Sequence, residues 1–296
     1  PEERQAAVDK ILPMQQDDFE GIFTAMKGLP VTVRLLDPPL HEFLPNLVEQ
    51  SLKVQKMENQ GADAGELDKE RRLLAQVKKL HEQNPMLGTR GCRLGMLYPE
   101  IPDMQARAII RAVLSVLQKE GETVQIHIMI PLVFTPTELE THRRIVQQAI
   151  DEEFEAAGTK VDVKIGTMIE LPRAALMAHK IAEEADFFSF GTNDLTQMTY
   201  GLSRDDAARF MGSYVAQGVY AEDPFHILDM EGVGEAAAGG LGVGNGPERV
   251  HHLLARQAQA AAVLLVGEAQ APVAVDVDDA HRQRIGDLAH EALALG

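Results

Sequence analysis

Short apolar runs alternate along the chain with longer segments of helical periodicity, and no other feature of the sequence restricts its fold as strongly. The runs that predict strands lie at residues 30–37, 91–94, 124–130, 161–169 and 187–190. Helical patterns lie between them at residues 49–83, where a break near Gly61–Gly65 indicates a hairpin, and at 103–119 and 172–184. Strand–helix alternation at this pitch predicts an α/β fold with a parallel sheet.

Two architectures accommodate such a sheet, a closed (β/α)8 barrel and an open doubly wound sheet. Open sheets that bind nucleotides usually carry a glycine-rich phosphate loop, and neither G-x-G-x-x-G nor G-x-x-x-x-G-K-[ST] opens a helix here. The sequence therefore favours the TIM barrel. Either architecture places its active site at the carboxyl ends of the strands.

The charge balance excludes several classes of partner. The chain has 296 residues and a formal net charge of −17 at pH 7. So acidic a surface has no general attraction for nucleic acid or anionic membranes, and no apolar run reaches the ~20 residues of a membrane span. Cys92 is the single cysteine, which excludes an internal disulfide and a cysteine-based zinc site. Without a signal-peptide pattern at its start, we expect a cytoplasmic enzyme.

Two carboxylates, Glu170 and Asp194, follow two successive predicted strands. Neighbouring parallel strands would bring both to the same edge of the sheet. Two carboxylates, completed by water and a substrate oxygen, suit Mg²⁺ or Mn²⁺. The alternative is that Glu170 caps the following helix and Asp194 only begins one.

Arg34 lies inside an apolar strand, where a guanidinium is costly unless it is paired or faces a site. With Arg90, it forms a second candidate pair. Arginine binds carboxylates and phosphates through two parallel hydrogen bonds, so two convergent arginines beside a metal pair indicate a small phosphorylated acid. The alternative is a structural salt bridge from Arg34 to Asp37 or Glu42.

The turn Gly191-Thr192-Asn193-Asp194 is the third candidate feature. Backbone N–H groups at a strand-to-helix turn form an anion site. The alternative is an ordinary turn, since Asn and Asp favour turns by themselves. We expect Cys92 to be a small buried side chain, because no neighbouring motif would lower its pKa.

Four strings of residues carry a resemblance to a known family: VRLLDPPLHEFLP at 33–45, NPMLGTRGCRL at 84–94, GTMIELPRAAL at 166–176 and FFSFGTNDLTQMT at 187–199. From about residue 3 to 234 the chain resembles the C-terminal domain of the pyruvate, phosphate dikinases, which binds phosphoenolpyruvate (PEP) and pyruvate. The DPPLHEF string separates this family from the related PEP synthases and from Enzyme I of the sugar phosphotransferase system.

The resemblance implies a (β/α)8 barrel and a role for each candidate residue. Arg34 and Arg90 match the arginines that grip the substrate. Glu170 and Asp194 match the Mg²⁺ ligands, and Gly191, Thr192 and Asn193 match the loop that contacts PEP. The implied chemistry is phosphoryl transfer between a phosphohistidine and the enol oxygen of pyruvate, within the conversion of ATP, pyruvate and phosphate to AMP, PEP and diphosphate.

The sequence also departs from the family pattern. The ATP-binding and phosphohistidine domains, which the resemblance implies as partners together with a homodimer, have no motif here. Neither the family's first-strand segment nor its acid/base cysteine segment has a counterpart. We therefore expect an incomplete barrel over residues 1–234, a divergent Ala- and Gly-rich tail over 235–296, and impaired activity. The rival hypotheses are a Mg²⁺-dependent lyase acting on a pyruvate enolate and a non-catalytic fragment.

Overall fold

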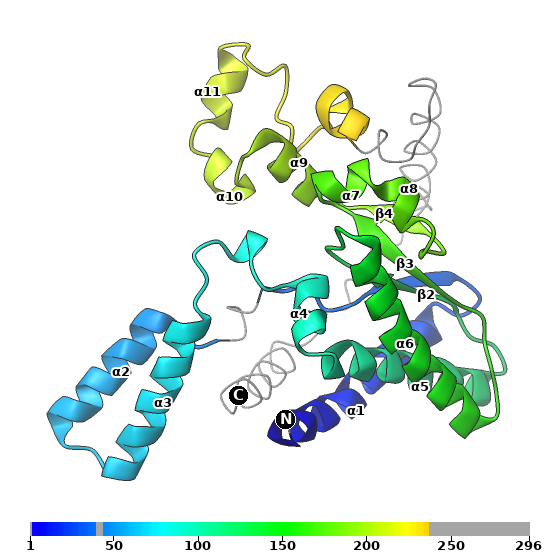
Figure 1. The fold of residues 1–296 in the computed structure, drawn as a ribbon, viewed down its shortest axis with the longest axis horizontal. Coiled ribbons are helices and arrows are strands. Elements are labelled where there is room, and N and C mark those ends of the chain that lie inside the picture. Colours follow the sequence, from blue (N-terminus) through cyan, green and yellow to red (C-terminus); the bar gives the residue numbers. More distant parts are fainter. Residues whose placement is uncertain (1, 40–43, 237–296) are drawn as a thin grey trace. The chain divides into compact units, whose positions relative to one another are not determined.

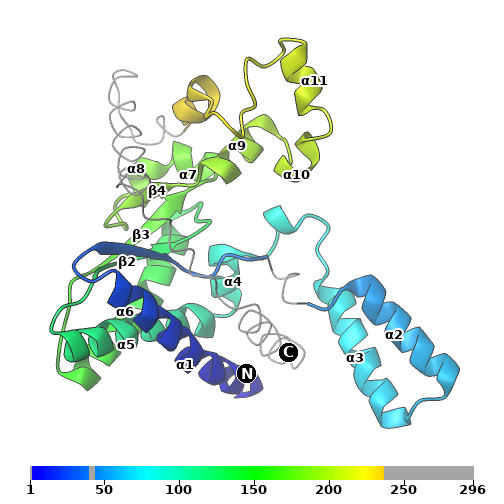
Figure 2. The same ribbon diagram turned by 180° about the vertical axis from the view of Figure 1, so that it is seen from behind.

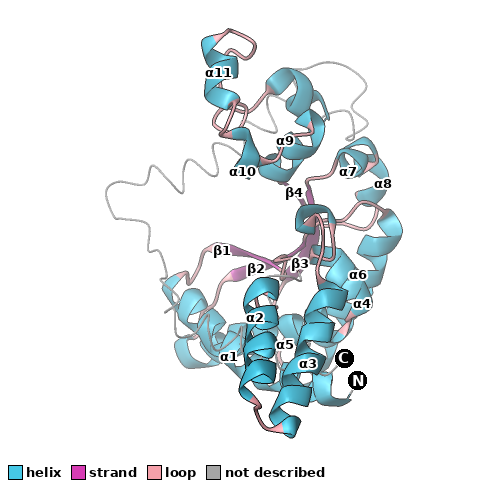
Figure 3. Cartoon of the chain, turned by 90° about the vertical axis from the view of Figure 1, so that its left-hand side faces the viewer, coloured by secondary structure: helices cyan, strands magenta, loops and turns pink. Residues whose placement is uncertain are grey.

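The computed structural model describes residues 2–39 and 44–236 (Figure 1). They form two compact units, one of residues 2–39, 44–129 and 141–164 and the other of residues 130–140 and 165–236. The boundary between the units passes through β2, α6 and β3. Helices make up most of the described chain (Figure 3).

The strands of the described residues are β1 (Pro30–Arg34), β2 (Gln125–Ile130), β3 (Val163–Ile169) and β4 (Phe188–Phe190). The helices are α1 (Glu2–Ala25), α2 (Leu47–Gln60), α3 (Ala64–Leu80), α4 (Gly91–Leu97), α5 (Glu100–Glu120), α6 (Pro136–Ala157), α7 (Pro172–Leu176), α8 (Ala178–Ile181), α9 (Thr192–Tyr200), α10 (Arg204–Ala207) and α11 (Met211–Ala216). A 3-10 turn, η2 (Pro85–Leu87), and a π-helical turn, η3 (Met230–Gly234), complete the regular elements.

The strands pair in parallel. β1 pairs with β2 in a register that sets Arg34 opposite Met129, and β3 pairs with β4 so that Ile169 lies opposite Phe190. The order of the four strands in the sheet is β1-β2-β3-β4. Parallel neighbours require a crossover connection, and each of these connections contains at least one helix. The predicted α/β fold with a parallel sheet is therefore confirmed.

The helical hairpin predicted over residues 49–83 is also confirmed. α2 ends at Gly61, whose φ of 64° lies in the left-handed region, and Asp63 caps α3 by accepting hydrogen bonds from two N–H groups of its first turn. Figure 1 shows the two helices side by side in opposite directions. The helix predicted over 172–184 is instead two short helices, α7 and α8, which meet at Met177.

The strand predicted at residues 91–94 is wrong, because this segment begins helix α4. Gly91, with a φ of 53°, turns the chain into the helix directly after Arg90. The residues buried in α4 are Gly91, Cys92, Leu94 and Gly95. Their three- and four-residue spacing suits one buried helical face, but a run of four residues is too short to reveal that period in the sequence. Cys92 is buried, as expected.

Charged side chains join α5 to the part of α6 in the same unit. Arg107 and Arg111 of α5 both bind the buried carboxylate of Glu153, with Arg111 donating twice, at 2.9 and 2.8 Å. Arg107 also binds the exposed Glu152 at 2.5 Å. α1 packs along α5, as the view from behind shows (Figure 2). No described helix combines the length and apolar character that crossing a membrane requires.

We predict that Glu153→Gln lowers the free energy of unfolding by about 1–2 kcal/mol, because it leaves the guanidinium of Arg111 without its carboxylate partner and removes one of the three carboxylates that bind Arg107. Urea unfolding at pH 7 measures the effect. Glu152→Gln is the matched control, since it removes the same charge from an exposed site and should change stability less. Equal effects of the two substitutions would contradict the structural role given to Glu153.

Candidate functional site

The two arginines predicted to bind substrate come together around one carboxylate. Arg34 is the last residue of β1, and Arg90 directly precedes α4. Asp37 lies between them with 6% of its surface exposed. Arg90 binds it with two hydrogen bonds, from Nε to Oδ1 at 3.1 Å and from Nη2 to Oδ2 at 2.6 Å. Arg34 Nη1 lies 3.7 Å from the same Oδ2.

The salt bridge considered for Arg34 therefore exists. Among the described residues, the guanidinium groups of Arg34 and Arg90 share the carboxylate of Asp37. The side chain of Arg34 is 49% exposed, so an anion in solution can reach it. Arg90 directly precedes α4, and its guanidinium is held by Asp37. Glu42, the other partner considered for Arg34, lies outside the described residues.

Glu170 and Gly191 lie side by side at the carboxyl ends of β3 and β4. The parallel pairing continues one step past the strands, because Gly191 N donates to Ile169 O at 3.0 Å. Glu170 is 1% exposed. A Cβ atom on Gly191 would lie 2.5 Å from both Cβ and Oε2 of Glu170, which is closer than such atoms approach. Only glycine at position 191 leaves room for this glutamate.

The first turn of α9 contains the other residues of the predicted loop. Thr192 and Asn193 are exposed, whereas Asp194 is buried. Asn193 Oδ1 accepts a hydrogen bond from Arg204 Nη1 at 2.9 Å. Gly191 precedes the helix and has no side chain to cap it, so the helix N-terminus keeps its affinity for an anion.

Glu170 and Asp194 provide two buried carboxylates from the ends of paired strands in one unit. Among the described residues, no group of three or more acidic, histidine or cysteine side chains is positioned to hold a metal. Mg²⁺ is commonly bound by only one or two carboxylates, with water and substrate oxygens completing its shell. In their chemistry, two buried carboxylates therefore suit Mg²⁺ as ligands.

A backbone group that no sequence pattern indicates also contacts this site. Leu132 N donates to Glu170 Oε1 at 2.6 Å, and Leu132 has a φ of 61°. Pro131 marks the end of the strand in the sequence, but nothing predicts a left-handed leucine, because Gly, Asn or Asp usually occupies that conformation.

The far end of α9 is anchored by a tyrosine–carboxylate pair. Burial and a hydrogen bond to Asp229 raise the pKa of Tyr200 to about 12. Burial alone would raise the pKa of Asp229, but hydrogen bonds from the backbone of Gly232 and from Tyr200 lower it below its ordinary value. At neutral pH the tyrosine is therefore protonated and the aspartate ionised, which holds the end of α9 against η3.

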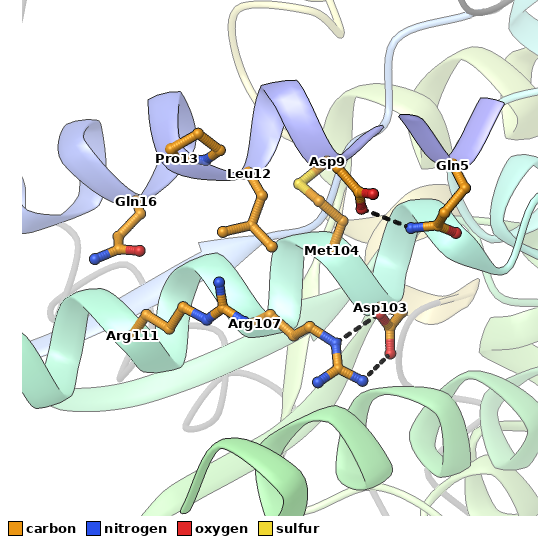
Figure 4. A pocket seen from close by; sticks show the side chains of 9 residues that line it. All are labelled: Gln5, Asp9, Leu12, Pro13, Gln16, Asp103, Met104, Arg107 and Arg111. Carbon is orange, nitrogen blue, oxygen red and sulfur yellow. Dashed lines mark hydrogen bonds and ion pairs between the residues drawn. The ribbon is translucent and has the colours of Figure 1, made fainter. Parts of the chain in front are cut away.

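A cavity of about 490 Å³ lies along α1 and α5 (Figure 4). None of the residues that line it was predicted to belong to a functional site. Its lining residues are Gln5, Asp9, Leu12, Pro13, Gln16, Asp103, Met104, Arg107 and Arg111. Both arginines bind the carboxylates that join α5 to α6. We therefore assign the charges of this cavity to helix packing.

Comparisons with known proteins show which family of enzymes the chain is similar to. The sequence model of the family described as "PEP-utilising enzyme, PEP-binding domain" matches residues 2–240. Pyruvate, phosphate dikinase 1, chloroplastic, of Arabidopsis thaliana is 53% identical over 234 residues, which cover 79% of this chain and 24% of that protein. Pyruvate, phosphate dikinase 2 of Zea mays is 53% identical over 232 residues, covering 78% of this chain and 26% of the relative. The chain thus spans about a quarter of the length of these relatives.

We predict that Gly191→Ala weakens the binding of Mn²⁺, used as a spectroscopic substitute for Mg²⁺, by about tenfold or more, because the added methyl displaces the Glu170 carboxylate. Electron paramagnetic resonance of free Mn²⁺ measures the affinity. Gly212→Ala in α11 is the matched control, since its Cβ would have no neighbour within 4 Å. An unchanged Mn²⁺ affinity in Gly191→Ala would remove Glu170 from the metal site.

Proposed function

Because the chain belongs to the PEP-utilising enzymes and contains their PEP-binding domain, we propose that it binds PEP and pyruvate and carries out one half of the pyruvate, phosphate dikinase reaction. In that half, a phosphoryl group passes between PEP and a histidine on another domain. The ATP-dependent half belongs to domains outside this chain, which spans about a quarter of its relatives' length.

The arrangement of Arg34 and Arg90 around Asp37 carries this proposal. In a chain with a net charge of −17, an anionic substrate needs a local cationic site. The two hydrogen bonds that Arg90 donates to Asp37 fix the plane of the guanidinium before any ligand binds. The half-exposed Arg34, whose Nη1 lies 3.7 Å from Asp37 Oδ2, adds a second guanidinium that a ligand in solution can reach. Phosphoryl transfer is catalysed mainly by positioning and charge stabilisation, which such a pair provides.

A second group of candidate residues, in the other unit, consists of Glu170, Asp194 and the start of α9. The two carboxylates would hold Mg²⁺, which when bound stabilises negative charge on the phosphoryl and enolate oxygens. The N–H groups of Thr192 and Asn193, at an uncapped helix start, would bind the carboxylate or phosphate of the ligand. Together these groups orient the enol oxygen of the substrate towards the phosphoryl group.

The fold supports the same proposal at a coarser level. Four parallel strands follow one another in sequence order, with helices in each connection. We propose that they belong to an incomplete (β/α)8 barrel over residues 1–234, and that residues 235–296 are a divergent tail. Nearly all of that tail lies outside the described residues.

We predict that chelation of divalent ions with EDTA weakens PEP binding at least tenfold, because the phosphate then loses its bridge to Glu170 and Asp194. Asp194→Asn should reproduce this loss in the presence of Mg²⁺. Isothermal titration with PEP measures both effects. Asp205→Asn, which removes the same charge from an exposed position of α10, is the control. Binding that EDTA and Asp194→Asn leave unchanged would exclude these carboxylates from the metal role.

We predict that pyruvate methyl protons exchange with deuterated solvent at the background rate in the presence of Mg²⁺ and this chain alone. Positioned acid–base catalysis is worth ~10²–10⁴-fold in rate. The family's cysteine for this step has no counterpart, and Cys92 is buried within α4. Proton NMR in D₂O measures the exchange. Fast exchange would show that another side chain of this protein acts as the acid, and the proposed impairment would be wrong.

A further inference from the structure

The loop between β2 and α6, residues 131–135, contacts the segment that carries Glu170 at two points. We propose that this loop orients the Glu170 carboxylate, with Leu132 and Arg173 as positioning residues. The expected effect on metal binding rests on the proposed role of Glu170 as a metal ligand. The contact between the loop and the Glu170 carboxylate does not depend on that role.

The first contact is the hydrogen bond from Leu132 N to Glu170 Oε1, at 2.6 Å. Glu170 is almost completely buried, and an ionised carboxylate in such a place needs strong donors. Because the donor is a backbone N–H, its direction depends on the conformation of the loop and not on a side-chain rotamer. Fixing Oε1 also fixes the plane of the carboxylate, and with it Oε2, which lies against Gly191.

The backbone of Leu132 is strained. Among the described residues, it is the one non-glycine residue with a positive φ, at 61°. The left-handed region is unfavourable for leucine, and such conformations persist where the surrounding structure imposes them, often at ligand sites. The leucine side chain is itself buried, which holds the residue in place. A glycine would adopt this conformation without a penalty but would lack that anchor.

The loop is tied down on both sides of Leu132. Before it, Thr167 Oγ1 of β3 donates to Ile130 O at 2.8 Å. After it, Glu138 Oε2 accepts hydrogen bonds from the N–H groups of Phe134 and Thr135, at 3.0 and 3.2 Å. Glu138 N in turn donates to Thr135 Oγ1, which confirms the capping box that the sequence pattern Thr-x-x-Glu indicates.

The second contact between the loop and the Glu170 segment is made by Arg173. Its Nη1 donates to Phe134 O, and its guanidinium lies 5.7 Å from the centre of the Phe134 ring. Arg173 follows Glu170 by only three residues, in the first turn of α7. The segment from Glu170 to Arg173 therefore accepts a hydrogen bond from the loop at one end and donates one to the loop at the other. A change at Arg173 should reach the carboxylate through Phe134 and Leu132.

The test compares Arg173→Met, which keeps the aliphatic stem but removes the charge and the donors, with Lys180→Met, which removes a charge from the exposed face of α8. In metal-free protein labelled with ¹⁵N-leucine, the Leu132 amide, assigned with a Leu132→Met variant, reports the hydrogen bond to Glu170. We expect Arg173→Met to shift the Leu132 amide proton upfield and to speed its exchange with solvent. Arg173→Lys should restore part of both effects, and Lys180→Met should cause neither.

The functional readout is Mn²⁺ affinity, measured as above. We expect Arg173→Met to weaken Mn²⁺ binding about tenfold or more, with little change in melting temperature. An unshifted Leu132 amide, or an unchanged Mn²⁺ affinity in a variant whose amide has shifted, would overturn the inference. A parent protein that binds no Mn²⁺ would instead overturn the proposed function, and the amide measurement would then decide whether the loop holds Glu170.

Discussion

The close packing of Glu170 against Gly191 is the constraint on which this end of the β3–β4 pair depends. The parallel register places Ile169 opposite Phe190, so the residues that follow them, Glu170 and Gly191, also lie side by side. The glutamate side chain then occupies the space that a Cβ at position 191 would fill. This contact has two consequences: the carboxylate of Glu170 is buried, and the residue that precedes α9 has no side chain to cap the helix.

Burying Glu170 has a cost that the surrounding backbone offsets. Its oxygen accepts a hydrogen bond from a leucine held in a left-handed conformation. The protein thus accepts strain at one residue to provide a donor that cannot rotate away. The Arg34–Asp37–Arg90 cluster shows a related arrangement, in which a buried carboxylate orients arginine. The charged groups held in position are the Glu170 carboxylate and the Arg90 guanidinium. The residues that hold them, Leu132 and Asp37, are both buried.

Local sequence signals predicted helices well where the helix was long or where capping and turn residues marked its ends. The hairpin of α2 and α3 follows from leucine spacing and from Gly61, and the start of α6 follows from Thr135, Pro136 and Glu138. The signals failed at Gly91–Leu94, where a run of four residues, Gly-Cys-Arg-Leu, is too short to distinguish the period of a helix from that of a strand. Burial of one face of α4, set by residues far along the chain, decides for the helix. The long helix expected after Glu170 likewise breaks at Met177 without a proline or glycine to mark it.

The sequence by itself determined the α/β class and the identity of the charged residues at the candidate site. Strand and helix periods, caps and turn residues are local properties, and the family strings that contain Arg34, Arg90, Glu170 and Asp194 are contiguous. The salt bridge from Arg34 to Asp37, three residues apart, was one of the alternatives drawn from the sequence. Only the tertiary structure decided that Asp37 also holds Arg90, and that the Leu132 N–H holds Glu170. These two partners lie 53 and 38 residues from the groups that they hold, and a backbone N–H is not marked by any residue type. Their roles arise from strand register and from packing, which no local pattern encodes.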